Sequence, residues 1–258
     1  MMSELNGRVA LVTGASRGLG AAAARALAAE GARVIVTDIA DASAVADEIG
    51  GIALTHDVTS EEDWARVIGV AKEEAGGLDI LVNNAGLFIM RPLLETTLDD
   101  WRRLHAVNCE GVFLGCRAAV PLMAERAQQW PGGASIINLS SVAGLRGSPG
   151  VSCYNSTKGA VRLFTKGIAL ELAASRIRVN SIHPGVIDTD MGTDLIHQFS
   201  GVWGVGNNEG RDQVAGLHPL GRLGAPVDIA NAVAFLASDR SAFMTGSEVV
   251  VDGGMTAR

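Results

Sequence analysis

The stretch Arg8-Val9-Ala10-Leu11-Val12-Thr13-Gly14-Ala15-Ser16-Arg17-Gly18-Leu19-Gly20 decides the fold of this chain. It begins as a continuous apolar run typical of a buried parallel strand, and its glycines lead into an alanine-rich segment. Glycine lets the main chain approach a phosphate, and the N-terminus of the following helix supplies free N–H groups and partial positive charge. The stretch therefore favours a strand–turn–helix that holds a pyrophosphate. A plain strand-to-helix connection with glycines at its caps is the alternative.

Apolar runs alternate with helical patterns along the chain, which predicts parallel β–α–β units in one doubly wound α/β Rossmann domain. We predict seven parallel strands, at 8–13, 33–38, 52–56, 79–83, 134–140, 176–182 and 247–251. We predict helices on both faces of this sheet, at 19–30, 42–49, 60–75, 98–126, 152–174 and 226–237. Because no linker divides the sequence, residues 1–258 are expected to form a single domain.

Composition excludes several classes of protein. The formal net charge is −7, with 21 basic against 28 acidic residues and no basic tract, which argues against nucleic acids and anionic membranes as partners. No apolar run approaches the ~20 residues needed to span a bilayer, and MMSELNGR lacks the apolar core of a signal peptide. Three cysteines suit a reducing cytoplasm, and five histidines without zinc-binding spacing predict no metal site.

Tyr154, Lys158 and Ser141 form a candidate catalytic group. Tyr154 and Lys158 stand four residues apart, so one helical turn would place the phenol and the amine on the same face. A nearby cation favours the phenolate and lowers the pKa of a tyrosine from its usual value of about 10. The pattern therefore predicts a tyrosine that exchanges protons, with a pair on an ordinary helix as the alternative.

Six separated motifs make the chain similar to the short-chain dehydrogenase/reductase family. They are TGASRGLG at 13–20, Asn83-Asn84-Ala85-Gly86, Asn108, Ser141, Tyr154-x-x-x-Lys158 and Pro184-Gly185. They stand in the family's order and spacing, from Asn6 to about Thr256. NSTKGAVRLFTK, RIRVNSIHPGVI and GSEVVVDGG resemble secondary-alcohol, cyclic-alcohol and hydroxysteroid dehydrogenases most. The resemblance implies an enzyme that interconverts a secondary alcohol and its ketone with NAD(H).

The resemblance also implies a role for each catalytic residue. Tyr154 would exchange the proton of the substrate, and Lys158 would lower the pKa of Tyr154 and hold the nicotinamide ribose. Ser141 would contact the substrate oxygen, whereas Ser140 would be a structural hydroxyl. Asn108, through its side chain or a neighbouring carbonyl, would hold a water on the proton path. A serine hydrolase would need a G-x-S-x-G sequence, and none is present.

The same resemblance implies the residues that would surround the dinucleotide. The first group comprises Gly14, Ser16, Arg17, Gly18, Leu19, Gly20, Asp38, Ile39, Asp57, Val58, Asn84, Ala85 and Gly86. The second comprises Pro184, Gly185, Ile187 and Thr189 at the nicotinamide, together with Tyr154 and Lys158. A helix-capping role for Asp57 and ordinary turns at Asn83-Asn84 and at 184–189 are the alternatives.

Asp38 predicts which cofactor the chain prefers. A carboxylate after the second strand can accept both ribose hydroxyls of NAD, and it repels the additional phosphate of NADP. Two like charges 4 Å apart repel by about 4 kcal/mol at an effective dielectric constant of 20. Arg17 favours NADP, but no basic residue follows Asp38. We therefore expect NAD over NADP.

Segment 189–222 has the least regular sequence and resembles a mobile lid over a substrate, with a flexible surface insertion as the alternative. Apolar side chains that could line the substrate cleft are Phe88, Met90, Leu145, Val151, Met191, Phe199 and Trp203. They suggest a small cyclic, aryl or steroid-like alcohol, and Arg91 and Arg146 could contact a polar group on it. Alternative functions are an NADP-dependent biosynthetic ketoreductase, a diol dehydrogenase and a non-catalytic dinucleotide sensor.

The predicted helix at 152–174 has more apolar surface than one sheet contact requires. One stripe comprises Val161, Phe164, Ile168 and Leu172, and a second comprises Ala160, Leu163, Gly167 and Leu170. A helix that is apolar on two sides needs a second packing partner. The resemblance implies that it pairs across a dimer interface within a homotetramer, and coverage by flanking helices is the alternative.

Overall fold

The computed structural model describes residues 4–257, which fold around a seven-stranded parallel sheet of order β3-β2-β1-β4-β5-β6-β7. The strands are β1 (Val9–Thr13), β2 (Arg33–Asp38), β3 (Ile52–Thr55), β4 (Ile80–Asn83), β5 (Ala134–Leu139), β6 (Ile177–Pro184) and β7 (Glu248–Val251). All seven predicted strands are confirmed, with ends that differ from the prediction by at most two residues. The apolar composition of these strands fits their position, because helices cover both faces of the sheet.

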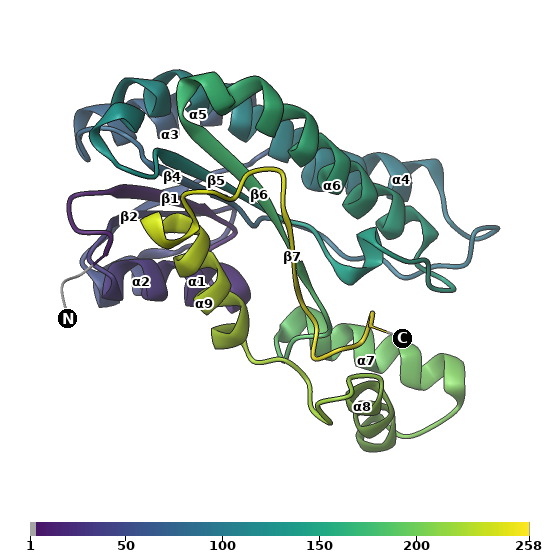
Figure 1. Cartoon of the computed structure of the whole chain (residues 1–258). Coiled ribbons are helices and arrows are strands. Elements are labelled where there is room, and N and C mark those ends of the chain that lie inside the picture. The colour runs from purple at the N-terminus through teal and green to yellow at the C-terminus, as the bar shows by residue number, and fades with distance from the viewer. Residues whose placement is uncertain (1–3, 258) are drawn as a thin grey trace.

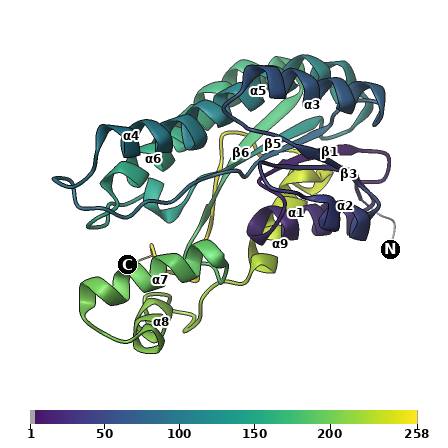
Figure 2. The same cartoon turned by 180° about the vertical axis from the view of Figure 1, so that it is seen from behind.

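Helices form a layer on each side of the sheet (Figure 1). One layer contains α1 (Gly18–Ala29), α2 (Ser43–Ile49) and α9 (Pro226–Ala237), and the other contains α3 (Glu61–Glu73), α5 (Gly111–Arg126) and α6 (Ser152–Leu172). Alternate residues of β1 point into opposite cores: Ala10 and Val12 pack with α1, whereas Val9 and Leu11 pack on the other side. The reverse view in Figure 2 shows the same two layers. Within residues 4–257, no helix combines the length and apolarity that crossing a membrane requires.

The order of the strands reverses at β1, which places a crevice at one edge of the sheet. Leu11 of β1 pairs with Ile35 of β2 on one side and with Leu81 of β4 on the other. The chain therefore leaves β1 and β4 toward opposite faces of the sheet. Ligands of open α/β sheets bind outside the carboxyl ends of the strands at such a point.

The helix predicted at 98–126 is interrupted. It consists of α4 (Leu98–His105), a π-helical turn at Ala106–Glu110 and α5. The turn inserts an extra residue and places Asn108 in the interior, where its side chain is fully buried. Such turns are frequent at functional sites, and they leave no apolar periodicity by which a sequence would reveal them.

Segment 189–222, for which the sequence predicted no helix, forms α7 (Asp190–Trp203) and α8 (Asn207–Gly216). Thr189 caps the start of α7 by accepting a hydrogen bond from the Gly192 amide, and Gly204, with φ of 68°, ends it. The two helices share a small apolar core of their own, whose buried members are Ile196, Val214 and Leu223. Figure 1 shows the pair beyond the carboxyl ends of β6 and β7.

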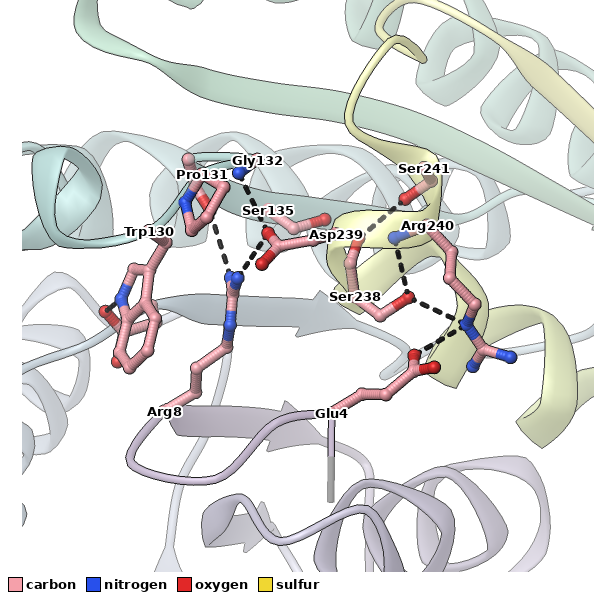
Figure 3. A network of polar contacts seen from close by, with 12 residues as sticks. Glu4, Arg8, Trp130, Pro131, Gly132, Ser135, Ser238, Asp239, Arg240 and Ser241 are labelled. Atoms are coloured by element: carbon pink, nitrogen blue, oxygen red, sulfur yellow. Dashed lines mark hydrogen bonds and ion pairs between the residues drawn. The ribbon is translucent and has the colours of Figure 1, made fainter. Parts of the chain in front are cut away.

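A charged network fastens the opposite end of the sheet (Figure 3). Arg8, whose side chain is 1% exposed, pairs with Asp239 at 2.5 Å, and the same carboxylate accepts the Gly132 amide at 2.9 Å. Burial lowers the pKa of the neighbouring Arg178 to about 10, and the charge of Arg8 lowers it further while Asp239 opposes both. The carboxylate of Asp239 therefore compensates the positive charge of two buried guanidinium groups.

Asp239→Ala should lower the free energy of unfolding by about 2–4 kcal/mol, because it leaves buried arginine charge without its partner. Chemical denaturation measures the loss. Glu4→Ala is the matched control, since Glu4 pairs with Arg240 at the exposed edge of the same network and should cost less than about 1 kcal/mol. Equal losses in the two variants would contradict this account.

Candidate active site

Every predicted site residue except Gly20 and Asn108 lines a single cleft of about 1670 Å³. The cleft lies at the carboxyl ends of the strands, where the sheet topology places a ligand. Gly20 and Asn108 lie directly behind the lining, and each supports it in a different way. No group of three or more His, Cys, Asp or Glu side chains in residues 4–257 could hold a metal ion.

The glycines of the turn after β1 are required by close packing. Gly14 has φ of +63°, and a Cβ atom there would lie 2.8 Å from Cα of Ala85. A Cβ atom on Gly20 would collide with the Gly14 carbonyl, so Gly20 lets α1 approach the turn. Arg17 precedes the first turn of α1, and no described side chain caps that end. The turn and the uncapped helix N-terminus therefore fit a pyrophosphate.

Asp38, at the end of β2, is held in place by the glycine-rich turn. Its Oδ2 accepts hydrogen bonds from the Ser16 amide at 3.0 Å and the Ser16 hydroxyl at 2.7 Å. Burial raises the pKa of Asp38, but these bonds and those from the Ala40 and Ile39 amides outweigh burial and lower it. The carboxylate is thus kept ionised and faces the cleft, which suits the hydroxyls of a ribose.

Two asparagines after β4 connect the strands around the crevice. The Asn83 side chain donates to Asn138 Oδ1 at 2.9 Å and so connects the ends of β4 and β5. The Asn84 side chain donates to the carbonyls of Thr13 and Gly14, both at 2.9 Å. Asn84 therefore fixes the glycine-rich turn while it lines the cleft. The next carboxylate along the cleft, Asp57, does not cap α3; Ser60 does.

Tyr154 lies on the first turn of α6 in an apolar surrounding. Its side chain packs edge-on against Phe88 at 5.0 Å between ring centroids, and Leu104 and Val151 complete the contact. Burial raises the pKa of Tyr154 to about 12, and a side-chain hydrogen bond with Ser141 opposes this only in part. Burial is the largest cause of this shift, and a lowering of the Tyr154 pKa by Lys158 stays a prediction.

Lys158 lies one turn further along α6, as predicted, with its amine 5.7 Å from the centroid of the Tyr154 ring. The amine donates to the Leu139 carbonyl at 2.9 Å, and the side chain is 5% exposed. Burial lowers the pKa of Lys158 to about 8, so the amine is only partly in its charged form above neutral pH.

Ser141 and Asn108 flank this pair. Ser141 follows β5, and its hydroxyl accepts the Ala143 amide at 3.1 Å while facing Tyr154. The Asn108 side chain accepts the Leu87 amide at 2.8 Å and donates to the Leu87 carbonyl and to Thr157. Ser140, predicted to be structural, donates to the Lys158 carbonyl at 2.9 Å. The predicted catalytic side chains are therefore brought together, with Asn108 behind them.

The loop after β6 closes the cleft opposite the glycine-rich turn. The cleft is lined from this loop by Pro184, Gly185, Ile187 and Thr189. The Thr189 side chain approaches Gly18, since a Cβ atom built on Gly18 would lie 3.7 Å from Cγ2 of Thr189. The two loops therefore form opposite walls of one cradle, as a dinucleotide requires.

A family model described as enoyl-(acyl carrier protein) reductase matches residues 14–256, which is nearly the whole chain. This chain belongs to the short-chain dehydrogenase/reductase family. Among its relatives in that family is 3-alpha-(or 20-beta)-hydroxysteroid dehydrogenase of Mycobacterium bovis, 45% identical over 100% of this chain and 92% of the relative. Cyclopentanol dehydrogenase of Comamonas sp. is 40% identical over 99% and 100%. The NADP-dependent (R)-specific alcohol dehydrogenase of Lentilactobacillus kefiri is 38% identical over the full length of both.

In this short-chain dehydrogenase/reductase the outer part of the cleft is mostly apolar. Six of the seven apolar residues predicted there do line it, namely Phe88, Met90, Val151, Met191, Phe199 and Trp203. Leu145 does not, because its neighbour Arg146 is the residue of that turn that faces the cleft. Arg91 is also outside the lining, since it pairs with Asp100 at 2.7 Å.

Sequence analysis missed lining residues that only the fold brings to the cleft. Met255 reaches it from the end of the chain, and its carbonyl accepts a hydrogen bond from Arg146 at 2.9 Å. Leu195 and Gln198 reach it from α7. No local pattern signals Met255, whereas the helical spacing of Met191, Leu195 and Phe199 could have revealed an α7 wall.

Proposed function

We propose that this chain is an NAD-dependent oxidoreductase that interconverts a secondary alcohol and its ketone. The observation that carries the proposal is the grouping of Ser141, Tyr154 and Lys158 in the same cleft as the uncapped N-terminus of α1. One end of the cleft suits the phosphates of a dinucleotide, and the other suits proton transfer to or from an apolar substrate.

The cofactor would supply the carbon that accepts or donates the hydride, while the protein supplies geometry and proton transfer. With a pKa of about 12, the Tyr154 phenol holds its proton at neutral pH, so it is ready to protonate the oxygen of a ketone. Ser141 would donate to the same oxygen and stabilise the charge that develops there. For alcohol oxidation the phenol must first lose its proton, which the positive charge of an oxidised nicotinamide favours.

Lys158 and Asn108 would complete the proton path. Lys158, which lines the cleft, would hold the nicotinamide ribose hydroxyls. The side chain of Asn108 is already bound to Leu87 and Thr157, so its main-chain carbonyl is our candidate for the water on this path.

The preference for NAD rests on Asp38, and Asp38→Asn should narrow it. The ratio of kcat/KM with NAD to that with NADP should fall by at least about tenfold, because the amide no longer repels a phosphate. Ser16 would still hold the side chain. Asp41→Asn is the matched control, since it removes the same charge three residues away and outside the cleft lining. A wild-type enzyme with higher kcat/KM for NADP would contradict the proposed preference.

The substrate that fits best is a cyclic, aryl or steroid-like secondary alcohol. The outer cleft is apolar, and the relatives named above include dehydrogenases of a hydroxysteroid and of cyclopentanol. Incubation with NAD and a panel of cyclic and aromatic alcohols, followed by the ultraviolet absorbance of NADH, tests the proposal. Absence of turnover with every alcohol and every corresponding ketone would contradict it.

We also propose that α7 and α8 act as a lid and that the chain assembles into a homotetramer through α6. Exposed ion pairs connect these helices to the cleft, from Arg211 to Asp188 and from Arg17 to Asp190. On α6, Leu163 is 69% and Leu170 81% exposed, so flanking helices do not cover the second stripe. Sedimentation velocity of wild type and of Leu170→Glu measures the assembly.

A further inference from the structure

His218 is fully enclosed where three segments of the chain meet. Its side chain is 2% exposed and lies between the end of α8, the loop after β6 and the turn after β7. Its Nε2 atom is so close to Gly185 that a Cβ atom there would lie 2.9 Å away. His218 is neither a catalytic nor a cofactor residue in the function proposed above.

The hydrogen bonds of His218 define its tautomer. Nδ1 lies 3.0 Å from the Val214 carbonyl, which can only accept, so Nδ1 carries the hydrogen. Nε2 lies 3.1 Å from the Val186 amide, which can only donate, so Nε2 is the acceptor. Among residues 4–257, the His218 ring is the only acceptor that the Val186 amide reaches.

The Val186 bond belongs to a set that fixes the loop after β6. The Val186 carbonyl accepts the Gly224 amide at 3.0 Å, the Gly224 carbonyl accepts the Asp188 amide at 2.8 Å, and the Gly185 amide donates to Val251 at 3.1 Å. Both partners of these bonds are main-chain groups, except in the bond from the Val186 amide to the His218 ring. The Val186 amide therefore depends on a side chain that is supplied by a residue 32 positions later in the sequence.

We propose that His218 is a positioning residue that holds loop 184–187 in the shape that receives the nicotinamide end of the dinucleotide. The inference rests on the proposed function, because it assigns this loop to the cofactor. The ring acts through Val186 and touches no reacting atom. Without the acceptor, a buried amide would be left unpaired and the loop would relax toward other hydrogen-bond partners.

Two variants separate the two bonds of the ring. The amide of asparagine can replace the Nδ1 donor, whereas the oxygen of glutamine can reach the place of the Nε2 acceptor. His218→Gln should therefore keep the bond to Val186, and His218→Asn should lose it. His105→Gln and His105→Asn are the matched controls, because His105 makes the same ring-to-carbonyl bond within α4, at 2.9 Å to Trp101, outside the cleft lining.

The first readout is hydrogen exchange of the Val186 amide, which needs neither cofactor nor activity. We expect faster exchange in H218N than in wild type and H218Q. The second is the Kd of NADH from fluorescence titration, which should rise at least about tenfold in H218N and stay within about threefold of wild type in H218Q. The KM for the cofactor should follow Kd, while kcat at saturating cofactor changes less.

Equal effects of H218N and H218Q on both readouts, or a larger effect of H218Q, would overturn the inference. If H218N does not fold, H218Q decides alone: retained NADH binding supports the inference, and a tenfold loss contradicts it. Wild-type protein that binds no NADH would refute the proposed function and, with it, the cofactor role of the loop. The exchange measurement would then still decide whether His218 holds Val186.

Discussion

Tyr154→Phe should lower kcat by about 10²–10⁴-fold while the Kd of NADH stays nearly unchanged. Phenylalanine fills the same space against Phe88 and Leu104, so only the group that exchanges the proton is lost. Steady-state kinetics and NADH titration measure the two quantities separately. The assignment of Tyr154 would be refuted by a variant that retains more than about a tenth of wild-type kcat.

The wild-type protein offers an independent check, because Tyr154 is the only tyrosine of the chain. The ultraviolet band of the phenolate therefore reports on this residue alone. A raised pKa of about 12 means that the protein without dinucleotide should show no phenolate until the solution is strongly alkaline. Saturation with NAD should move the titration toward lower pH, since a positive ring favours the phenolate. An unchanged titration would count against the proposed proton transfer.

Lys158→Met should abolish most turnover and yet make the protein more stable at neutral pH. Burial lowers the pKa of Lys158 from 10.5 to about 8, which means that the folded state disfavours the charged amine. The cost of that charge is fully present below about pH 8 and disappears as the pH rises to 10.5. The cost of the buried charge amounts to about 3 kcal/mol. Because Lys158→Met also loses the hydrogen bond to Leu139, the variant gains only part of this free energy.

Chemical denaturation of wild type and Lys158→Met across this range of pH is the measurement. The variant should be more stable by about 1–2 kcal/mol near pH 7, and its advantage should vanish toward pH 10.5. Lys166→Met is the matched control on α6, because the Lys166 side chain is 41% exposed and its charge is paired with Glu248. A variant that is less stable than wild type at every pH would contradict the buried-charge account.

The central strands could be predicted because they are short, largely apolar runs whose two faces are both buried, as in Val9–Thr13. The site residues could be predicted because residues at the carboxyl ends of neighbouring parallel strands lie at one edge of the sheet. The α7–α8 pair was missed because five glycines between 192 and 210 hide the apolar spacing that forms its core. The π-helical turn at 106–110 was missed because it preserves the helical composition on both sides.

Other parts of the site depend on the fold, and no local pattern contains them. The spacing of Tyr154 and Lys158 placed them correctly on one helix face but gave no measure of burial, which raises the Tyr154 pKa. Met255 and His218 act on residues that are distant in sequence. The spacing of histidines along a sequence can indicate a metal site, but it does not show which of them bond the main chain.

The hydrogen bond from Gly185 to Val251 has a consequence for biosynthesis. Its acceptor belongs to β7, which follows every other strand of the sheet in the sequence, whereas the glycine-rich turn comes directly after β1. Domains generally gain structure from the N-terminus while translation proceeds, and pairing between distant segments is slow. The glycine-rich turn is therefore synthesised long before the strand that anchors the loop after β6, and the two walls of the cleft can be joined only once β7 has been made.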